Sequence, residues 1–127
     1  MDWSFRNDLP IYSQLVEQIK LAIVSGAFSP GERLPSVRDM AMEAGVNPNT
    51  MQRALQELER EGMVFSQRTS GRFVTEARAV IETAKKSFAG ERIGAFLGSM
   101  RKLGYTGAEI VSLITERVKE ENNGLNT

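Results

Sequence analysis

The sequence lacks both cysteine and histidine. Without thiols the chain has no disulfide framework and no thiolate metal site, and without imidazoles the usual zinc sites are excluded. Catalysis by Ser–His or Cys–His pairs is excluded for the same reason, and no glycine-rich phosphate loop is present. We therefore predict that the protein is not an enzyme and holds no metal and no cofactor.

Long apolar runs and an excess of charge are also missing. No apolar run approaches the roughly 18 residues that span a bilayer, and residues 1–8 lack the basic segment and apolar run of a signal peptide. These absences predict a cytoplasmic protein with no membrane partner. The 16 basic and 16 acidic residues give zero net charge, which counts mildly against nucleic-acid binding. The position of the charges therefore matters more than their sum.

Two short helices joined by a tight glycine turn are the most informative pattern in the chain. The spacing predicts a first helix over residues 36–44 and a second over 47–61. Ser36 and Asn47 are good N-caps for these helices, and Gly45 between them suits the left-handed conformation that ends a helix. This is the layout of a DNA-binding helix-turn-helix, in which the start of the second helix faces base edges.

The second of these helices separates its side chains into two faces. The apolar face, which is predicted to point inward, consists of Val46, Met51, Ala54, Leu55 and Leu58. The polar side chains, of the kinds that pair with bases and phosphates, are Asn49, Thr50, Gln52, Arg53 and Gln56. Such a face is usually ordinary solvated surface, but after a Gly-Val-Asn-Pro turn it becomes a candidate DNA-reading surface.

Further elements on either side complete an N-terminal domain. Apolar residues recur at helical spacing between residues 8 and 26, which predicts another helix. Two β-prone runs, 63–66 and 72–75, surround a polar turn that contains a glycine, which predicts a hairpin. The short extended piece near Leu34 is expected to add a third strand. Three helices and a hairpin make a winged helix-turn-helix, which we assign to residues 1–76.

The remaining residues, 77–127, predict two helices separated near Gly104. Thr106 and Glu109 have the spacing of a capping box, which marks the start of the last helix. Two helices are too few to enclose a core, so their apolar faces need a partner, and a two-fold homodimer is the commonest solution. The predicted dimer interface consists of Ile81, Phe88, Ile93, Phe96, Leu97, Met100, Ile110, Leu113 and Ile114.

Part of this apolar face has an alternative role. A pocket for an unknown small-molecule effector between protomers is the second interpretation, and its candidate lining is Phe88, Phe96, Met100 and Tyr105. The dimer core is the simpler interpretation, because a long exposed apolar stripe on a monomer would favour association in any case.

Large apolar side chains elsewhere are assigned to packing. Met40, Met42 and Met51 are predicted to fill the core of the N-terminal domain. Trp3 and Phe5 precede the first predicted helix and are expected to pack the N-terminal arm against that domain.

The motifs of the N-terminal half resemble the GntR family of bacterial transcription regulators. The match covers residues 9 to 75 and consists of P-I-Y-S-Q-L (10–15), G-A-F-S-P-G-E-R-L-P-S-V-R (26–38), G-V-N-P-N-T (45–50), A-L-Q-E-L-E-R-E-G (54–62) and G-R-F-V (71–74). The short two-helix C-terminus and the N-P-N-T turn resemble the YtrA-like subfamily. The resemblance implies a homodimeric repressor that binds an inverted repeat in double-stranded operator DNA. Such operators often lie in the promoter of the repressor's own operon, which in this subfamily frequently encodes an ABC transporter.

The resemblance also implies roles for individual residues. Arg38 is expected to contact DNA from the first helix of the pair. The start of the second helix, with Asn47, Asn49 and Thr50, is expected to read the major groove. Gly71 at the wing is expected to let the backbone approach the minor groove.

The chain departs from the family pattern at Pro48 and Gln52, where many members carry arginine. Arg53 is the candidate replacement, although it lies about 100° further round the helix than Gln52. Arg68 and Arg72 flank the hairpin turn, where arginines either contact phosphate or keep a sheet edge soluble. The predicted DNA-binding residues are Arg38, Asn47, Asn49, Thr50, Gln52, Arg53, Arg68, Gly71 and Arg72.

An alternative function is a protein-interaction module that uses the winged helix without binding DNA. Zero net charge permits this alternative. A module of this kind would need an apolar or acidic surface on the second helix of the pair, which Asn49, Thr50 and Arg53 do not supply. The residues therefore favour a sequence-specific DNA-binding regulator.

Overall fold

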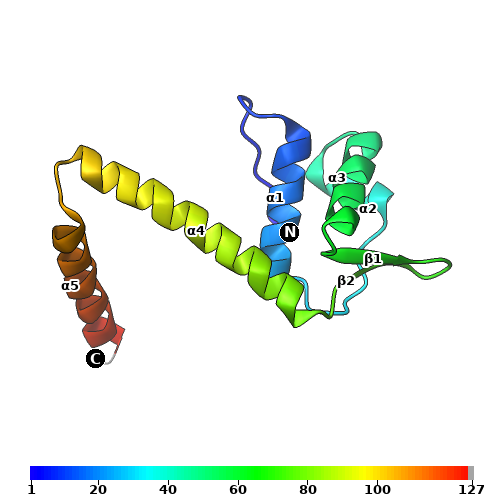
Figure 1. The fold of residues 1–127 in the computed structure, drawn as a ribbon. Helices are drawn as coiled ribbons and strands as arrows, with labels where there is room; N and C mark the ends of the chain where they lie inside the picture. Colours follow the sequence, from blue (N-terminus) through cyan, green and yellow to red (C-terminus); the bar gives the residue numbers. More distant parts are fainter. Residues whose placement is uncertain (126–127) are drawn as a thin grey trace. The chain divides into compact units, whose positions relative to one another are not determined.

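The computed structural model of the protein describes residues 1–125 and has a mostly α-helical fold with one small sheet (Figure 1). The described elements are, in order, α1 (Ile11–Val24), α2 (Val37–Ala44), α3 (Pro48–Arg60), β1 (Val64–Gln67), β2 (Gly71–Val74), α4 (Arg78–Lys102) and α5 (Gly107–Leu125). They form two compact units, of which the first is Met1–Lys86 and the second begins at Ser87. The predicted fold class, a winged helix-turn-helix followed by two helices, is confirmed.

The helix-turn-helix has the caps that the sequence predicts. Ser36 Oγ accepts a hydrogen bond from the Asp39 backbone N–H at 3.1 Å at the start of α2. Gly45 ends α2 with φ at +71°, a conformation that residues with a Cβ rarely adopt. Asn47 Oδ1 then accepts from the Asn49 backbone N–H at 2.8 Å and starts α3. These caps set the turn between the two helices and so fix where α3 begins.

The sheet is an antiparallel hairpin of two short strands. Its register pairs Val64 with Val74 at one end and Gln67 with Gly71 near the turn. The extended piece before α2 contacts the hairpin at an isolated bridge between Arg33 and Phe73. The predicted third strand is therefore present as a single bridge, with no further ladder among the described residues.

The core of the first unit lies where α1 and α3 pack together and the hairpin closes one end. Its most deeply buried side chains include Leu15, Ile19, Met51, Leu55 and Leu58. The apolar stripe predicted for α3 therefore points inward, as expected.

One of the three methionines predicted to fill the core does not. Met40 and Met51 are buried, but Met42 is 73% exposed. Met42 lies about 200° round α2 from Met40, because an α-helix turns by about 100° per residue. The prediction for Met42 was wrong because the short α2 buries only one narrow face.

The N-terminal arm packs beside α1 and α2 as predicted for Trp3 and Phe5. The two rings stack with their centroids 6.1 Å apart, and both are partly buried against the core. Trp3 Nε1 donates to Glu43 Oε1 at 3.2 Å. The Gln18 amide pairs with the Ser4 backbone, accepting from its N–H at 3.2 Å and donating to its C=O at 2.7 Å.

The first turns of α4 belong to the first unit. Val80, Ile81 and Ala84 are partly buried and pack against its core. This compact unit therefore extends beyond residue 76, the boundary predicted for the winged helix, and includes Lys86. A side chain predicted for the dimer interface, Ile81, packs against the core of its own chain.

The second unit consists of the rest of α4, which runs uninterrupted through Gly90, and of α5. Gly104 adopts φ of +97° after α4. The predicted capping box is confirmed, since Thr106 N donates to Glu109 Oε1 at 2.9 Å and Glu109 N donates to Thr106 Oγ1 at 3.2 Å. Among the described helices, none has the length and apolar character needed to cross a membrane.

Candidate nucleic-acid interface

The start of α3 presents polar side chains to solvent. Asn47 and Asn49 are exposed, Thr50 is half-buried, and Arg38 is exposed on α2. The cap uses only the side-chain oxygen of Asn47, so its amide N–H groups remain for an outside contact. These side chains have the hydrogen-bonding groups that contact base edges and phosphates.

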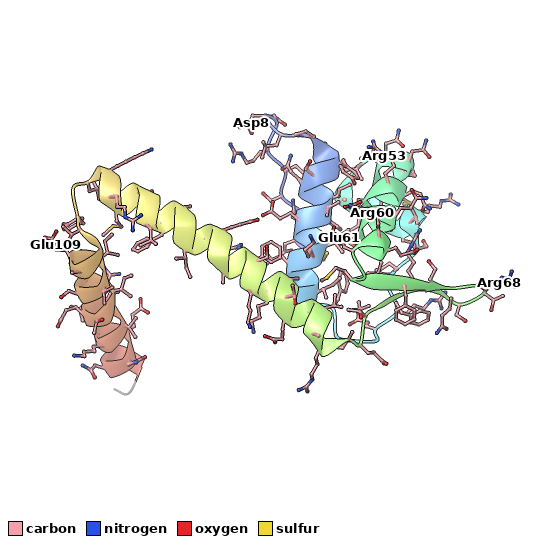
Figure 2. The ribbon with its side chains drawn as sticks, in the orientation of Figure 1. Asp8, Arg53, Arg60, Glu61, Arg68 and Glu109 are labelled. Atoms are coloured by element: carbon pink, nitrogen blue, oxygen red, sulfur yellow. The ribbon has the colours of Figure 1, made fainter. Side chains whose placement is uncertain are left out.

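Arg53 lies one turn further along α3 and stacks on α1. Its guanidinium carbon is 4.7 Å from the centroid of the Tyr12 ring, and Figure 2 shows the side chain at the outer surface of the helices. Stacking uses the face of the guanidinium and leaves its N–H donors at the edge. Arg53 thus keeps the donors that its predicted DNA contact requires.

A groove of about 460 Å³ lies between the hairpin and the start of α2. Arg68, Gly71 and Arg72 line it from the hairpin side, and Arg33 lines it from the extended piece before α2. Three arginines in one groove favour an anionic backbone such as that of DNA. Arg33 was absent from the predicted set, although its place directly before Leu34, in the piece predicted to pair with the hairpin, was a signal for it.

Gly71 is required by the backbone at the start of β2. Its φ is +103°, a region in which L side chains are strained. A Cβ added there would lie 3.2 Å from Nε of Arg33. The small residue therefore keeps this part of the hairpin low beside Arg33, and Figure 2 shows Arg68 projecting from the hairpin tip.

Arg72 is engaged inside the chain. Its Nε donates to Glu59 Oε1 at 2.8 Å, and its Nη1 donates to Gln52 Oε1 at 3.3 Å. The Arg72 side chain is only 17% exposed. The Ser66 hydroxyl also donates to Glu59 Oε1, so one carboxylate at the end of α3 holds both strands of the hairpin. The phosphate contact predicted for Arg72 stays a prediction, and it competes with this ion pair.

Replacing Glu59 with glutamine is expected to lower stability at neutral pH and to lose that effect in acid. The Ser66 hydroxyl, and after it the Arg72 guanidinium, hold the pKa of the Glu59 carboxyl below its ordinary value. A lowered folded-state pKa adds stability above the unfolded-state pKa, and this stability is lost as pH falls through the folded-state pKa. Urea midpoints of wild type and Glu59→Gln should therefore differ at about pH 7 and converge towards about pH 3. A gap that widens in acid would contradict the role of this carboxylate.

The ion pairs of the first unit leave one set of arginines without an acidic partner. Elsewhere Arg6, Lys20 and Arg60 are paired with Asp8, Glu61 and Glu57. Within the described side chains, no ion pair involves Arg33, Arg38, Arg53 or Arg68. Positive charge is therefore available around α2, α3 and the hairpin although the net charge of the chain is zero.

The second unit leaves most of its large apolar side chains uncovered. Ile93, Phe96, Leu113 and Ile114 are exposed, with 56% of Ile93 accessible. The half-buried members of the predicted interface are Phe88, Leu97 and Met100, and Ile110 is buried. Across the described residues, acidic side chains form no cluster able to hold a metal ion.

Comparisons with known proteins agree with this geometry. The profile of "Bacterial regulatory proteins, gntR family" matches residues 11–74. The uncharacterized HTH-type transcriptional regulator YhcF of Bacillus subtilis is 39% identical over 111 residues, which cover 87% of this chain and 92% of the relative. The HTH-type transcriptional repressor YtrA of the same organism is 34% identical over 116 residues, covering 91% of this chain and 86% of the relative.

Solved structures extend the similarity to the whole fold. A GntR family transcriptional regulator from Listeria monocytogenes has a TM-score of 0.80 at 35% identity, covering 88% of this chain and 98% of that chain. The DNA-binding domain of AraR in complex with operator ORX1 has a TM-score of 0.54 at 26% identity, covering 59% of this chain and 96% of that chain. Profile, relatives and folds thus agree, and the chain belongs to the GntR family of bacterial regulatory proteins, in its YtrA-like branch, as a DNA-binding transcription regulator.

Proposed function

We propose that the protein is a homodimeric repressor that binds an inverted repeat in double-stranded operator DNA. The observation that carries this proposal is the pairing of two unsatisfied surfaces in one chain. Unpaired arginines and exposed amides surround α2, α3 and the hairpin, and a separate unit exposes apolar side chains that water disfavours. The first surface fits DNA, and the second fits another copy of the chain.

A symmetric dimer explains how a small domain with zero net charge binds DNA tightly. Two α3 helices enter successive major grooves about 34 Å apart, which corresponds to about 10 bp. The groove lined by Arg33 and Arg68 takes the phosphate backbone, and the hairpin reaches towards the adjacent minor groove. Linking two modest sites raises the effective affinity by about 10²- to 10⁴-fold.

Repression and the choice of operon rest on the relatives. The Bacillus subtilis protein YtrA is named a repressor, and the AraR DNA-binding domain was solved on operator DNA. We place the operator of this protein in the promoter of its own operon, with a transporter as the regulated product. The effector pocket predicted at Phe88, Phe96, Met100 and Tyr105 remains an alternative use of the same apolar surface.

The proposal is tested by fluorescence-anisotropy titration of the protein against DNA from upstream of its own gene. A scrambled duplex of the same length and composition is the control, and both are titrated at several salt concentrations. Tight binding to the upstream DNA alone, with affinity falling steeply as salt rises, is expected because phosphate contacts release counterions. Equal weak binding to both duplexes would overturn the assigned operator, and no binding even at low salt would favour a protein-interaction module.

Replacing Arg38 with alanine is expected to weaken binding to every duplex, whereas Asn49→Ala or Thr50→Ala should erode sequence discrimination. A phosphate contact carries no sequence information, and its removal reduces the salt slope by about 0.9. Removal of a base contact costs about 1–3 kcal/mol of discrimination. Titration on operator and scrambled duplexes separates the two effects. Identical behaviour of the three variants on both duplexes would show that these roles are wrongly assigned.

A further inference from the structure

A chain of hydrogen bonds links the hairpin to the polar face of α3. It begins at the Ser66 hydroxyl, which donates to Glu59 Oε1. Arg72 Nε donates to the same oxygen at 2.8 Å, and Arg72 Nη1 donates to Gln52 Oε1 at 3.3 Å. The chain ends at Gln52, one of the side chains predicted to contact DNA.

The chemistry of this chain fixes the orientation of the Gln52 amide. A guanidinium group has only donors, so the atom of Gln52 that faces Arg72 must be the oxygen. Arg72 is itself held by Glu59, and its side chain is 17% exposed, so it is not free to turn away. The Gln52 NH₂ group, which has no partner among the described residues, is left as the outward end of the amide.

We propose that Gln52 determines specificity as a donor-only reader of the major groove, and that Arg72 and Glu59 are positioning residues that orient its amide. A free glutamine favours adenine, because it uses its oxygen and its nitrogen together on N6 and N7. With the oxygen held by Arg72, only N–H donors remain for the base. Guanine offers two adjacent acceptors, N7 and O6, whereas cytosine offers a donor. We therefore expect guanine at the contacted position, an inference that rests on the proposed DNA-binding function.

Selection from a library of random-sequence duplexes tests this assignment. Wild-type protein should enrich a motif with guanine at one position in each half-site. Gln52→Ala, Arg72→Ala and Glu59→Gln should each lose the preference at that position alone, by about 5- to 100-fold, the range expected for one base contact. Gln52→Glu replaces the donors with acceptors, so its preference should move to cytosine.

Two further variants separate orientation of Gln52 from charge and from folding. Arg72→Lys keeps the positive charge but loses the fork of donors that joins Glu59 to Gln52, so it should also lose the guanine preference. Arg60→Ala removes an arginine on the same helix that is paired with Glu57 instead, so its motif should equal that of wild type. Circular dichroism of each variant confirms that it is folded before selection.

The opposite result is equally clear. If Arg72→Ala retains every base preference, lowers affinity for all duplexes alike and reduces the salt slope by about 0.9 for each phosphate that it no longer neutralises, Arg72 is a phosphate ligand and the inference is wrong. Retention of the guanine preference in Gln52→Ala would overturn it as well. Wild-type protein that enriches no motif would instead overturn the proposed function, and this inference with it.

Discussion

Replacing Phe96 with glutamate should convert the protein into a monomer and lower its operator affinity by about 10²- to 10⁴-fold. Phe96 lies on α4 in the second unit and is 42% exposed in the single chain. In the proposed dimer its ring is buried, and a carboxylate at that place would lose its hydration without gaining a partner. Light scattering measures the mass of the variant, and anisotropy on the operator measures the loss of affinity.

A second variant and a matched control make the dimer prediction specific. Ile114→Glu on α5 should have the same effect as Phe96→Glu, because Ile114 is also an exposed apolar residue of the second unit. Ser112→Glu adds the same charge to the same helix about 160° away from Ile114, and it should leave both mass and affinity unchanged. A wild-type protein that is monomeric at micromolar concentration would refute the dimer, and dimeric Phe96→Glu would move the interface elsewhere.

Replacing Leu55 with alanine should remove about 2–5 kcal/mol of the free energy of unfolding of the first unit. Leu55 lies in the middle of α3, is 1% exposed and packs in the core beneath the DNA-facing helix. Total stabilities of small domains are about 5–15 kcal/mol, so the variant should be partly unfolded under conditions in which wild type is folded. Urea unfolding followed by circular dichroism measures the change.

Met42→Ala is the control for this experiment. Met42 lies on the neighbouring helix α2 and is 73% exposed, so its truncation should change the free energy of unfolding by no more than about 0.5 kcal/mol. If Leu55→Ala were as mild as Met42→Ala, the packing described for α3 would be wrong.

The fold of the first unit was predictable because its signals are local. Ser36, Gly45 and Asn47 each act on backbone groups within a few residues, so their sequence neighbours suffice to identify the two caps and the turn. The hairpin is equally local, since its strands are separated only by a short turn. The capping box of α5 follows the same rule.

The partners of the candidate site were not predictable, because they come from distant parts of the chain. The carboxylate that engages Arg72 is Glu59, 13 residues earlier, and only the packing of the hairpin against α3 brings the two together. Arg53 stacks on Tyr12 for a similar reason, since α1 and α3 are adjacent in space but not in sequence. A pattern of residue types identified the polar face of α3 but not the hydrogen bonds that orient it.

The N-terminal arm supplies the protein with an internal optical probe. Trp3 is the single tryptophan of the chain, and it is stacked on Phe5 and hydrogen-bonded to Glu43 within the first unit. The aromatic residues of the second unit are phenylalanines and one tyrosine, so indole emission comes from the first unit alone. Fluorescence of Trp3 therefore follows melting of the DNA-binding unit, while light scattering of the same sample follows separation of the protomers.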